Sequence, residues 1–248
     1  MKTTFIFDVD GTLADTERDG HRVAFNQAFQ ASGLDWHWDR QTYGELLSVT
    51  GGQERIRQYI DSHDKPQKGR PGLDEVISRL HQVKTEKYLA LLNASAVPLR
   101  SGVERLLQDA RRAGIRLAIA TTTTPVSVTA LLENTLGESG ADWFEVIGAG
   151  DIVPEKKPAP DIYRYVLDQM KISADQCVAF EDSANGLRSS LSAGLDTIVT
   201  YNDYTRGQDF AGAQMVLDRI GDPGRPSREL RSSLQQDFLT VDLLLQQF

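Results

Sequence analysis

The feature that most constrains the fold is a series of short, nearly continuous apolar runs separated by helical patterns. The runs are too short for helices, and their apolar residues occupy both faces, as expected of strands covered by helices on both sides. They lie at 3–7, 115–120, 144–147, 177–180, 197–200 and 215–217. Helical patterns at 103–113, 161–170 and 183–193 lie between the later runs. This alternation predicts right-handed βαβ units and an α/β fold with an open parallel sheet.

One long stretch, residues 15–95, departs from this alternation. It contains no convincing β run and predicts consecutive helices at 18–31, 39–47, 52–63 and 73–92. We therefore predict an α/β core domain of residues 1–14 and 96–248 with an inserted small α-helical domain of residues 15–95. Hinges are expected near 14–16 and 94–98. Spaced apolar residues after Gly221 predict one or two further helices packed on the core.

Composition and charge narrow the classes of partner. The 248 residues carry a net charge of −8, which disfavours nucleic acid and anionic membranes, and no apolar run approaches the ~18 residues of a membrane span. The single cysteine, Cys177, excludes an internal disulfide and is expected to be a buried strand residue. Acidic residues interrupt the first apolar run, so we expect neither a secretory signal nor a transit peptide. We expect a cytoplasmic monomer.

The first predicted strand ends in Asp8-Val9-Asp10-Gly11-Thr12. Strand alternation directs Asp8 and Asp10 to the same side, at the carboxyl end of a strand where open α/β sheets bind ligands. Two carboxylates this close repel each other unless a cation or a shared proton lies between them. The alternative interpretation is a simple acidic turn, because Asp-Gly is a common turn pair.

Three further polar features follow later predicted strands. Thr121 and Thr122 follow the second strand, Lys157 lies in a loop stiffened by prolines, and Glu181-Asp182 follows the fourth strand. Each has a structural alternative: a polar strand end, a solvated lysine pair, or an N-cap formed by Asp182. Their common position at strand ends, in this order, favours one catalytic site.

Together these motifs resemble the haloacid dehalogenase (HAD) superfamily, in its capped phosphatase and phosphomutase branch, over essentially the whole chain. The resemblance implies a Rossmann-like HAD core with an inserted helical cap and a phosphoric monoester hydrolase activity. Asp8 matches the nucleophile that forms an aspartyl-phosphate, and Asp10 matches the general acid/base. Thr121 and Lys157 match the residues that bind the transferring phosphoryl group. Mg²⁺ is the implied cofactor, with Glu181 binding it directly or through water; the implied ligands are Asp8, the Asp10 carbonyl, Glu181 and Asp182.

Specificity is expected from polar residues of the helical insertion. Glu17 and His21 share one helix face, although a surface ion pair would look the same. A Gly-Gly turn followed by Arg55 at a helix start can bind an anion, although it also suits a plain interhelical turn. Lys84 is a further candidate, with an exposed helix face as its alternative. The candidate substrate-binding residues are Glu17, His21, Gly51, Gly52, Arg55, Lys84 and Thr122.

Within the superfamily, the insertion resembles that of CbbY proteins. The segments that carry this resemblance are 19–22, 24–26, 38–39, 43–47, 51–55 and 84–85. CbbY proteins dephosphorylate xylulose-1,5-bisphosphate, an inhibitor of Rubisco in the Calvin cycle, to xylulose-5-phosphate. The resemblance implies a sugar bisphosphate substrate, whose second phosphate would explain Arg55, Lys84 and the glycine turn. One departure is Gln53, where lysine is common in the family.

Three alternatives stay open at this point. A β-phosphoglucomutase-like enzyme shares the core motifs and returns the phosphoryl group to an intermediate. A HAD phosphatase of another sugar phosphate would carry the same core. A receiver-like signalling module also surrounds a phosphorylated aspartate with acidic residues, Thr and Lys, but it places that aspartate on a middle strand and has no cap.

Overall fold

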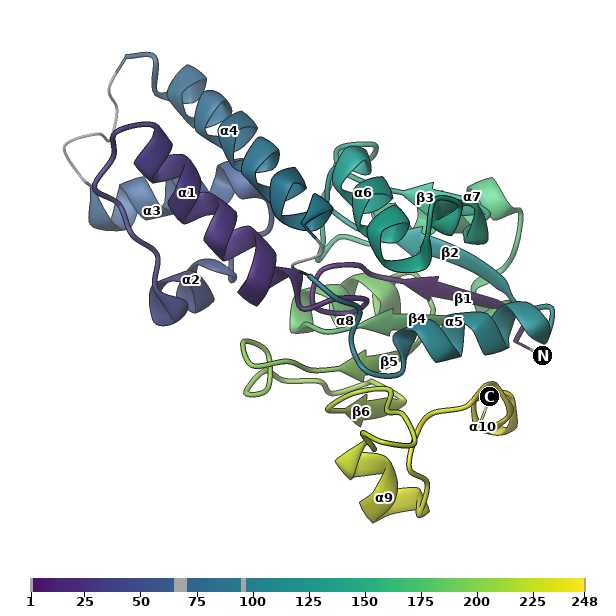
Figure 1. Ribbon diagram of the computed structural model, residues 1–248. Helices are drawn as coiled ribbons and strands as arrows, with labels where there is room; N and C mark the ends of the chain where they lie inside the picture. Colours follow the sequence, from purple (N-terminus) through teal and green to yellow (C-terminus); the bar gives the residue numbers. More distant parts are fainter. Residues whose placement is uncertain (1, 65–70, 95–96, 248) are drawn as a thin grey trace. The chain divides into compact units, whose positions relative to one another are not determined.

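The computed structural model describes residues 2–64, 71–94 and 97–247 (Figure 1). The chain divides into two compact units. Met1–Asp15 together with Pro98–Phe248 forms the first, called here the α/β unit, and Thr16–Val97 forms the second, called the helical unit. The predicted boundaries fell after residues 14 and 95, and the observed ones fall after residues 15 and 97.

The α/β unit is built on a six-stranded parallel sheet in the order β3-β2-β1-β4-β5-β6. Its strands are β1 Thr4–Phe7, β2 Arg116–Ala120, β3 Val146–Gly148, β4 Cys177–Glu181, β5 Asp196–Thr200 and β6 Met215–Leu217. All six predicted strands are confirmed, with ends shifted by at most a few residues. The order reverses between β1 and β4, and the crevice at such a reversal is where open α/β sheets bind ligands.

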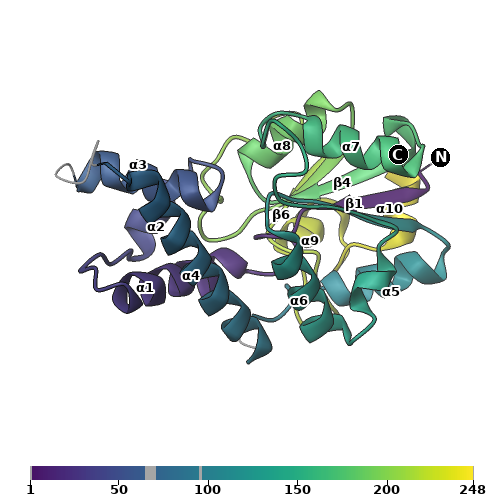
Figure 2. The same cartoon turned by 90° about the horizontal axis from the view of Figure 1, so that it is seen from above.

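Helices cover both faces of this sheet, with α7 and α8 on one face and α5 and α6 on the other (Figure 2). The helices of this unit are α5 Val103–Arg112, α6 Pro125–Leu136, α7 Asp161–Met170, α8 Ala184–Ser192, α9 Arg228–Leu234 and α10 Val241–Gln247. Short 3₁₀ turns occupy Gly140–Trp143 and Ala174–Gln176. The prediction of one or two C-terminal helices is confirmed. Helix α6 was not predicted, because its first turn is rich in β-branched residues, although Pro125 at the start was a usable signal.

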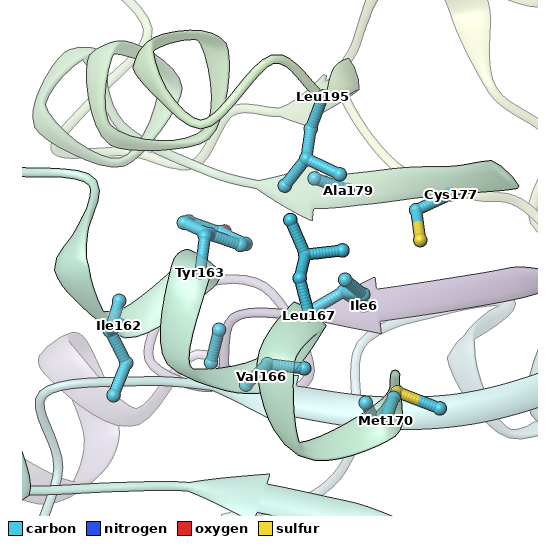
Figure 3. Packing of buried hydrophobic residues seen from close by; sticks show 11 residues of the cluster. Ile6, Ile162, Tyr163, Val166, Leu167, Met170, Cys177, Ala179 and Leu195 are labelled. Carbon is cyan, nitrogen blue, oxygen red and sulfur yellow. The ribbon is translucent and has the colours of Figure 1, made fainter. Parts of the chain in front are cut away.

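One hydrophobic cluster of this unit forms between α7 and the central strands. Figure 3 shows side chains of α7 packed on Ile6 of β1 and on Ala179 of β4. Tyr163 and Cys177 are fully buried in the same cluster, which confirms the prediction for the cysteine. Burial raises the pKa of the Cys177 thiol to about 11. Burying a side chain the size of Ile6 contributes about 1.5–3 kcal/mol, so this layer holds β1 and β4 together.

The helical unit contains the predicted helices with one difference. Its elements are a π turn at Glu17–His21, α1 Arg22–Ala31, α2 Arg40–Leu46, α3 Gly52–His63 and α4 Leu73–Asn93. The predicted helix 18–31 therefore begins as a π turn. Gly20 lies within it, and a Cβ at Gly20 would come 2.6 Å from the Tyr88 ring of α4. The glycine allows a close approach of the two helices at this turn.

An aromatic cluster fills the centre of the helical unit. Trp38 is fully buried, and its ring centroid lies 4.6 Å from that of Phe25. The Asn26 side-chain amide accepts the Trp38 backbone N–H at 2.7 Å and donates to the Trp38 carbonyl at 2.9 Å.

The predicted hinge at 94–98 includes residues 95–96, which lie outside the described residues. None of the described helices combines the length and hydropathy that a membrane span requires.

Candidate active site

The turn that follows β1 brings the first two candidate residues to the carboxyl edge of the sheet. Asp8 follows the strand directly, is buried, and donates its backbone N–H to the Phe180 carbonyl at 3.0 Å. Gly11 has φ of +81° and donates to the Ala14 carbonyl at 2.8 Å. A Cβ at Gly11 would lie 2.3 Å from the Asp182 carboxylate. Glycine is therefore required here both by the backbone and by the close approach of a second carboxylate.

Lys157 lies at the centre of this edge. Its ammonium group donates to Asp8 Oδ1 at 2.7 Å, to Glu181 Oε1 at 2.7 Å and to the Ala120 carbonyl at 2.9 Å. The side chain is only 6% exposed, so the alternative of a solvated lysine pair is wrong for Lys157. The neighbouring Lys156 points elsewhere and pairs with Asp151 at 3.0 Å.

Three buried carboxylates, those of Asp8, Glu181 and Asp182, surround the same point, with one ligand oxygen of each within 4.8 Å of the others. Glu181 also accepts a hydrogen bond from the Tyr163 hydroxyl at 2.5 Å, and Asp182 accepts one from the Asn202 amide at 2.7 Å. Asp182 does not cap the following helix. Ser183 does, because its side chain accepts the hydrogen bond that closes the first turn of α8.

The charges of this cluster shift one another's pKa values. Burial raises the pKa of the Asp8 carboxyl from 3.8 to about 7, because Lys157 offsets only part of the burial penalty and Glu181 and Asp10 raise it further. Burial alone would lower the pKa of Lys157, but Asp8 and Glu181 outweigh it and hold that pKa above its usual value. Burial and Glu181 together raise the pKa of Tyr163 well above its usual value, so its hydroxyl stays a donor.

This donor set fits a divalent cation. Three carboxylates share one buried point with a single ammonium paired to two of them, so the cluster carries an excess of negative charge. A hard ion such as Mg²⁺ prefers oxygen ligands of this kind and usually keeps several waters. The residues present therefore match the magnesium site that the sequence predicts.

Asp10 and the threonines after β2 lie beside the cluster. Asp10 is half-buried, and its carboxylate accepts a hydrogen bond from the Thr123 hydroxyl. Thr121 is buried and accepts the Thr123 backbone N–H at 3.2 Å, while Thr122 is half-buried. The Asp10 carboxylate therefore binds the Thr123 hydroxyl and is not one of the three carboxylates that surround the possible metal position. Its predicted metal contact, through the backbone carbonyl, stays a prediction.

In the helical unit, Glu17 and Arg55 meet at Tyr43. The Tyr43 hydroxyl donates to Glu17 and accepts from Arg55 Nη1 at 2.9 Å, and Glu17 lies 3.7 Å from the same arginine nitrogen. Arg55 is buried, and its guanidinium lies 5.2 Å from the centre of the Tyr43 ring. The alternative of a surface pair between Glu17 and His21 is wrong, because His21 is buried with another partner.

That partner is Lys84. Its ammonium lies 2.8 Å from His21 Nδ1 and about equally far from two aromatic rings, 5.0 Å from Phe25 and 5.1 Å from Tyr88. Lys84 is buried, so the alternative of an exposed helix face is wrong. The helical unit therefore buries two cationic side chains against one aromatic cluster.

The glycine turn before α3 is occupied by side chains of the chain itself. Gly51 has φ of +102°, and a Cβ there would lie 2.1 Å from the Glu54 carboxylate. A Cβ at Gly52 would lie 2.4 Å from His81 Nε2. An anion bound at this turn would have to displace the Glu54 carboxylate, so the geometry favours Arg55 and Lys84 over Gly51-Gly52 as anion ligands.

Several residues around the α/β site were not predicted. Tyr163 lies on a helix, away from any strand end, so no sequence signal pointed to it. Gly186 lets Glu181 approach, since a Cβ there would be 1.8 Å from the carboxylate. Asn202 follows β5 by two residues, and Thr123 follows β2 by three. The rule about strand ends that found the other residues could have found these two.

Comparison with known proteins gives consistent results. A model of the haloacid dehalogenase-like hydrolases matches residues 2–194. Protein CbbY of Cereibacter sphaeroides is 47% identical over 224 residues, covering 90% of this chain and 95% of that protein. A crystal structure of a CbbY variant from Rhodobacter sphaeroides in complex with xylulose-1,5-bisphosphate has a TM-score of 0.81 and 47% identity, covering 88% of this chain and 95% of that one. A β-phosphoglucomutase from Clostridium difficile, at 21% identity and a TM-score of 0.71 over 88% of this chain and 92% of that one, shares the fold.

Proposed function

Because the chain belongs to the haloacid dehalogenase-like hydrolases, as a phosphatase of the CbbY-like group, we propose that it hydrolyses xylulose-1,5-bisphosphate to xylulose-5-phosphate in a Mg²⁺-dependent reaction. The observation that carries the proposed chemistry is the buried Asp8–Lys157 pair at the carboxyl edge of β1. The support for the substrate is the complex of a CbbY variant, 47% identical to this chain, with that bisphosphate.

Asp8 is the proposed nucleophile. A carboxylate that attacks a phosphate dianion meets like charge, so positive charge must lie beside both groups. Lys157, fixed by three acceptors at 2.7–2.9 Å, supplies one such charge next to the attacking oxygen. Splitting the displacement into two steps through a covalent intermediate lowers each barrier.

Mg²⁺ would be held by Asp8, Asp182 and the Asp10 carbonyl, together with water. When bound, it neutralises charge on the phosphoryl oxygens and on the attacking carboxylate. Glu181 is assigned to the layer behind the ion, because one of its oxygens already accepts from Lys157 and from Tyr163. In that role Glu181 would align Lys157 and would contact the metal only through a water.

The remaining residues act on the proton and on the phosphoryl oxygens. In the first step the Asp8 carboxylate forms a bond to phosphorus while the bond from phosphorus to the sugar oxygen breaks, and Asp10 gives that oxygen a proton. In the second step Asp10 takes a proton from the water that attacks phosphorus, which releases phosphate and restores Asp8. The Thr123 hydroxyl orients the Asp10 carboxylate throughout. Thr121 binds an equatorial phosphoryl oxygen.

The helical unit is proposed as the cap that selects the substrate. Arg55 and Lys84 are both buried cations, and Arg55 offers the planar fork that binds phosphate oxygens in pairs. We assign them to the second phosphate of the bisphosphate, with Glu17 and His21 holding the two cations in place and positioned to contact the sugar hydroxyls. A cap of this kind would also shield an aspartyl-phosphate from bulk water between the two steps.

A phosphate-release screen tests this function. Purified protein with Mg²⁺ is given sugar mono- and bisphosphates, including xylulose- and ribulose-1,5-bisphosphate, with Asp8→Asn as the inactive control. We expect xylulose-1,5-bisphosphate to give the highest kcat/KM. Conversion of β-glucose-1-phosphate to glucose-6-phosphate without free phosphate, with a trace of the 1,6-bisphosphate present, would instead identify a mutase.

A further inference from the structure

Arg100 is a buried arginine that none of the proposed catalytic steps uses. It lies in the segment that precedes helix α5, and its side chain is 8% exposed. Its guanidinium donates to the Gly11 carbonyl, to the Thr200 and Tyr201 carbonyls at 2.7 Å each, and to the Asp218 carbonyl at 3.0 Å. One of these carbonyls ends β5 and the other three lie in the segments that follow β1, β5 and β6, so one side chain joins the carboxyl ends of three strands.

Two of those segments reach the metal site directly. Asn202, next to Tyr201, donates to Asp182 Oδ2 at 2.7 Å. A Cβ at Gly11 would lie 2.6 Å from the Asn202 amide nitrogen and 2.3 Å from Asp182 Oδ2, so the three residues are in close contact. The segment after β5 contacts the start of α8 a second time, because Gln208 accepts the backbone N–H of Ala184 at 2.7 Å.

The backbone of Arg100 is itself held in place. Its N–H donates to the Leu13 carbonyl at 2.8 Å, and Ala14 forms a bridge with Leu99. The Asp15 carboxylate lies 3.3 Å from the Arg100 side chain. The backbone of Arg100 is therefore fixed, and so is the position of its guanidinium. The guanidinium in turn holds the four carbonyls to which it donates.

We propose that Arg100 is a positioning residue of the active site, which fixes the turn carrying Asp10 and, through Tyr201 and Asn202, the orientation of Asp182. This inference rests on the proposed function, because the proposed function makes Asp182 a ligand of the metal. Removing Arg100 would free the segment after β5, and Asn202 would no longer hold the carboxylate in a single orientation. Residues behind metal ligands typically change metal affinity by about 10- to 100-fold when they are replaced.

Only arginine fits this position. Five N–H donors in a rigid plane can serve several carbonyls at once, whereas a lysine ammonium is a single point with three donors. Burial lowers the pKa of Arg100, although Asp15 and Asp182 oppose that shift, and an arginine starts high enough to remain charged. A lysine here would leave buried carbonyls without donors.

The chain provides a matched control in Arg105. This arginine also joins backbone segments, because it donates to the Gly221 carbonyl at 2.7 Å and to the Leu239 carbonyl at 3.0 Å. Those carbonyls belong to the C-terminal segment and not to the segments that carry Asp10 or Asn202. Arg105→Lys therefore reports the general effect of shortening a partly buried arginine that binds backbone carbonyls.

The experiment measures Mg²⁺ binding by calorimetry without substrate, on wild type, Arg100→Lys, Asn202→Ala and Arg105→Lys. We expect the Kd for Mg²⁺ to rise about 10- to 100-fold in the first two variants and less than about twofold in Arg105→Lys. At saturating Mg²⁺ the KM of the Arg100→Lys enzyme should stay near the wild-type value, because the substrate contacts are unchanged.

Three results would overturn the inference: a wild-type Kd in Arg100→Lys, an equal rise in Arg105→Lys, or an unchanged Kd in Asn202→Ala. If Arg100→Lys fails to fold, the Asn202→Ala variant decides, because Arg100 acts on Asp182 through Tyr201 and Asn202. Wild-type protein that releases phosphate without binding Mg²⁺ would contradict the proposed function itself, which is a different outcome from an unaffected Arg100 variant.

Discussion

The two units bury charges of opposite sign: carboxylates outnumber cations in the cluster of the α/β unit, and cations outnumber carboxylates in that of the helical unit. The α/β unit gathers the three carboxylates of Asp8, Glu181 and Asp182 around the Lys157 ammonium. The helical unit gathers Arg55 and Lys84 around one carboxylate, Glu17, and one imidazole. The net charge of each cluster favours a ligand of the opposite sign. The first cluster attracts a cation and the second attracts an anion, as expected if chemistry and substrate selection are divided between the units.

Loss of the nucleophile should have the largest effect. Asp8→Asn keeps the shape of the side chain but removes the attacking charge, so kcat should fall by about 10⁴-fold or more. Phosphate release at saturating Mg²⁺ and substrate measures this. Because Asp182 and the Asp10 carbonyl remain, calorimetry should show that Mg²⁺ still binds, with moderately lower affinity. Retention of more than a tenth of the wild-type kcat would show that the α/β cluster is not the reacting centre.

Loss of a cation in the helical unit should affect substrate selection without affecting the chemistry of the α/β cluster. Arg55→Ala should lower kcat/KM for the bisphosphate by about 10- to 100-fold, the range for losing a hydrogen bond to a charged group, and leave hydrolysis of p-nitrophenyl phosphate nearly unchanged. Arg57→Ala is the control, because Arg57 lies on the same helix, is 47% exposed and pairs with Asp74 at the surface. Equal losses on both substrates would mean that Arg55 acts on folding or on catalysis and not on selection.

Gly186 tests how tightly the carboxylate cluster is packed. Gly→Ala inside a helix normally stabilises it by up to about 1 kcal/mol, but here the added Cβ would collide with Glu181. Gly186→Ala should therefore lower the free energy of unfolding by about 1–3 kcal/mol, as overpacking does, and reduce kcat with it. Urea denaturation compares it with Gly207→Ala, whose added Cβ would meet nothing within 4 Å. A stabilised Gly186→Ala would show that Glu181 has room to move.

The smallest effect concerns pH. The pKa of Asp8 in the folded protein is about 7, above its ordinary value of 3.8, so the metal-free fold holds a proton that the unfolded chain has released. The stability of the metal-free protein should therefore fall as pH rises from about 4 to 7, and Mg²⁺ competes with that proton. Thermal unfolding should show that Mg²⁺ raises Tm by more at pH 8 than at pH 5.5. An equal rise at both pH values, or an unchanged difference in Asp8→Asn, would contradict this.

The sequence was informative where function follows the strand ends. Parallel strands bring their carboxyl ends to one edge, so the pattern at the end of each apolar run was enough to group Asp8, Thr121, Lys157 and Glu181. Tyr163 could not be grouped this way, because it reaches Glu181 from helix α7, through a contact that depends on packing.

The helical unit was harder to predict, because helical periodicity does not distinguish a buried polar residue from a solvated one. Lys84 fitted an exposed face as well as an inner one, and only its packing on His21, Phe25 and Tyr88 shows which is correct. Likewise, Gly51 and Gly52 suggested an anion site, whereas the space beside them is taken by Glu54 and His81. The contacts of Lys84 and His81 join helices that are separated in sequence, so periodicity within one helix does not show them.

The most direct test of the central claim is a rapid-quench experiment. Enzyme, Mg²⁺ and xylulose-1,5-bisphosphate are mixed, stopped in acid within one turnover, and the peptide containing Asp8 is analysed by mass spectrometry. We expect a phosphoryl group on the Asp8 side chain, formed at least as fast as the enzyme turns over and absent from Asp8→Asn. Normal turnover with Asp8 unmodified at every time point would contradict the account.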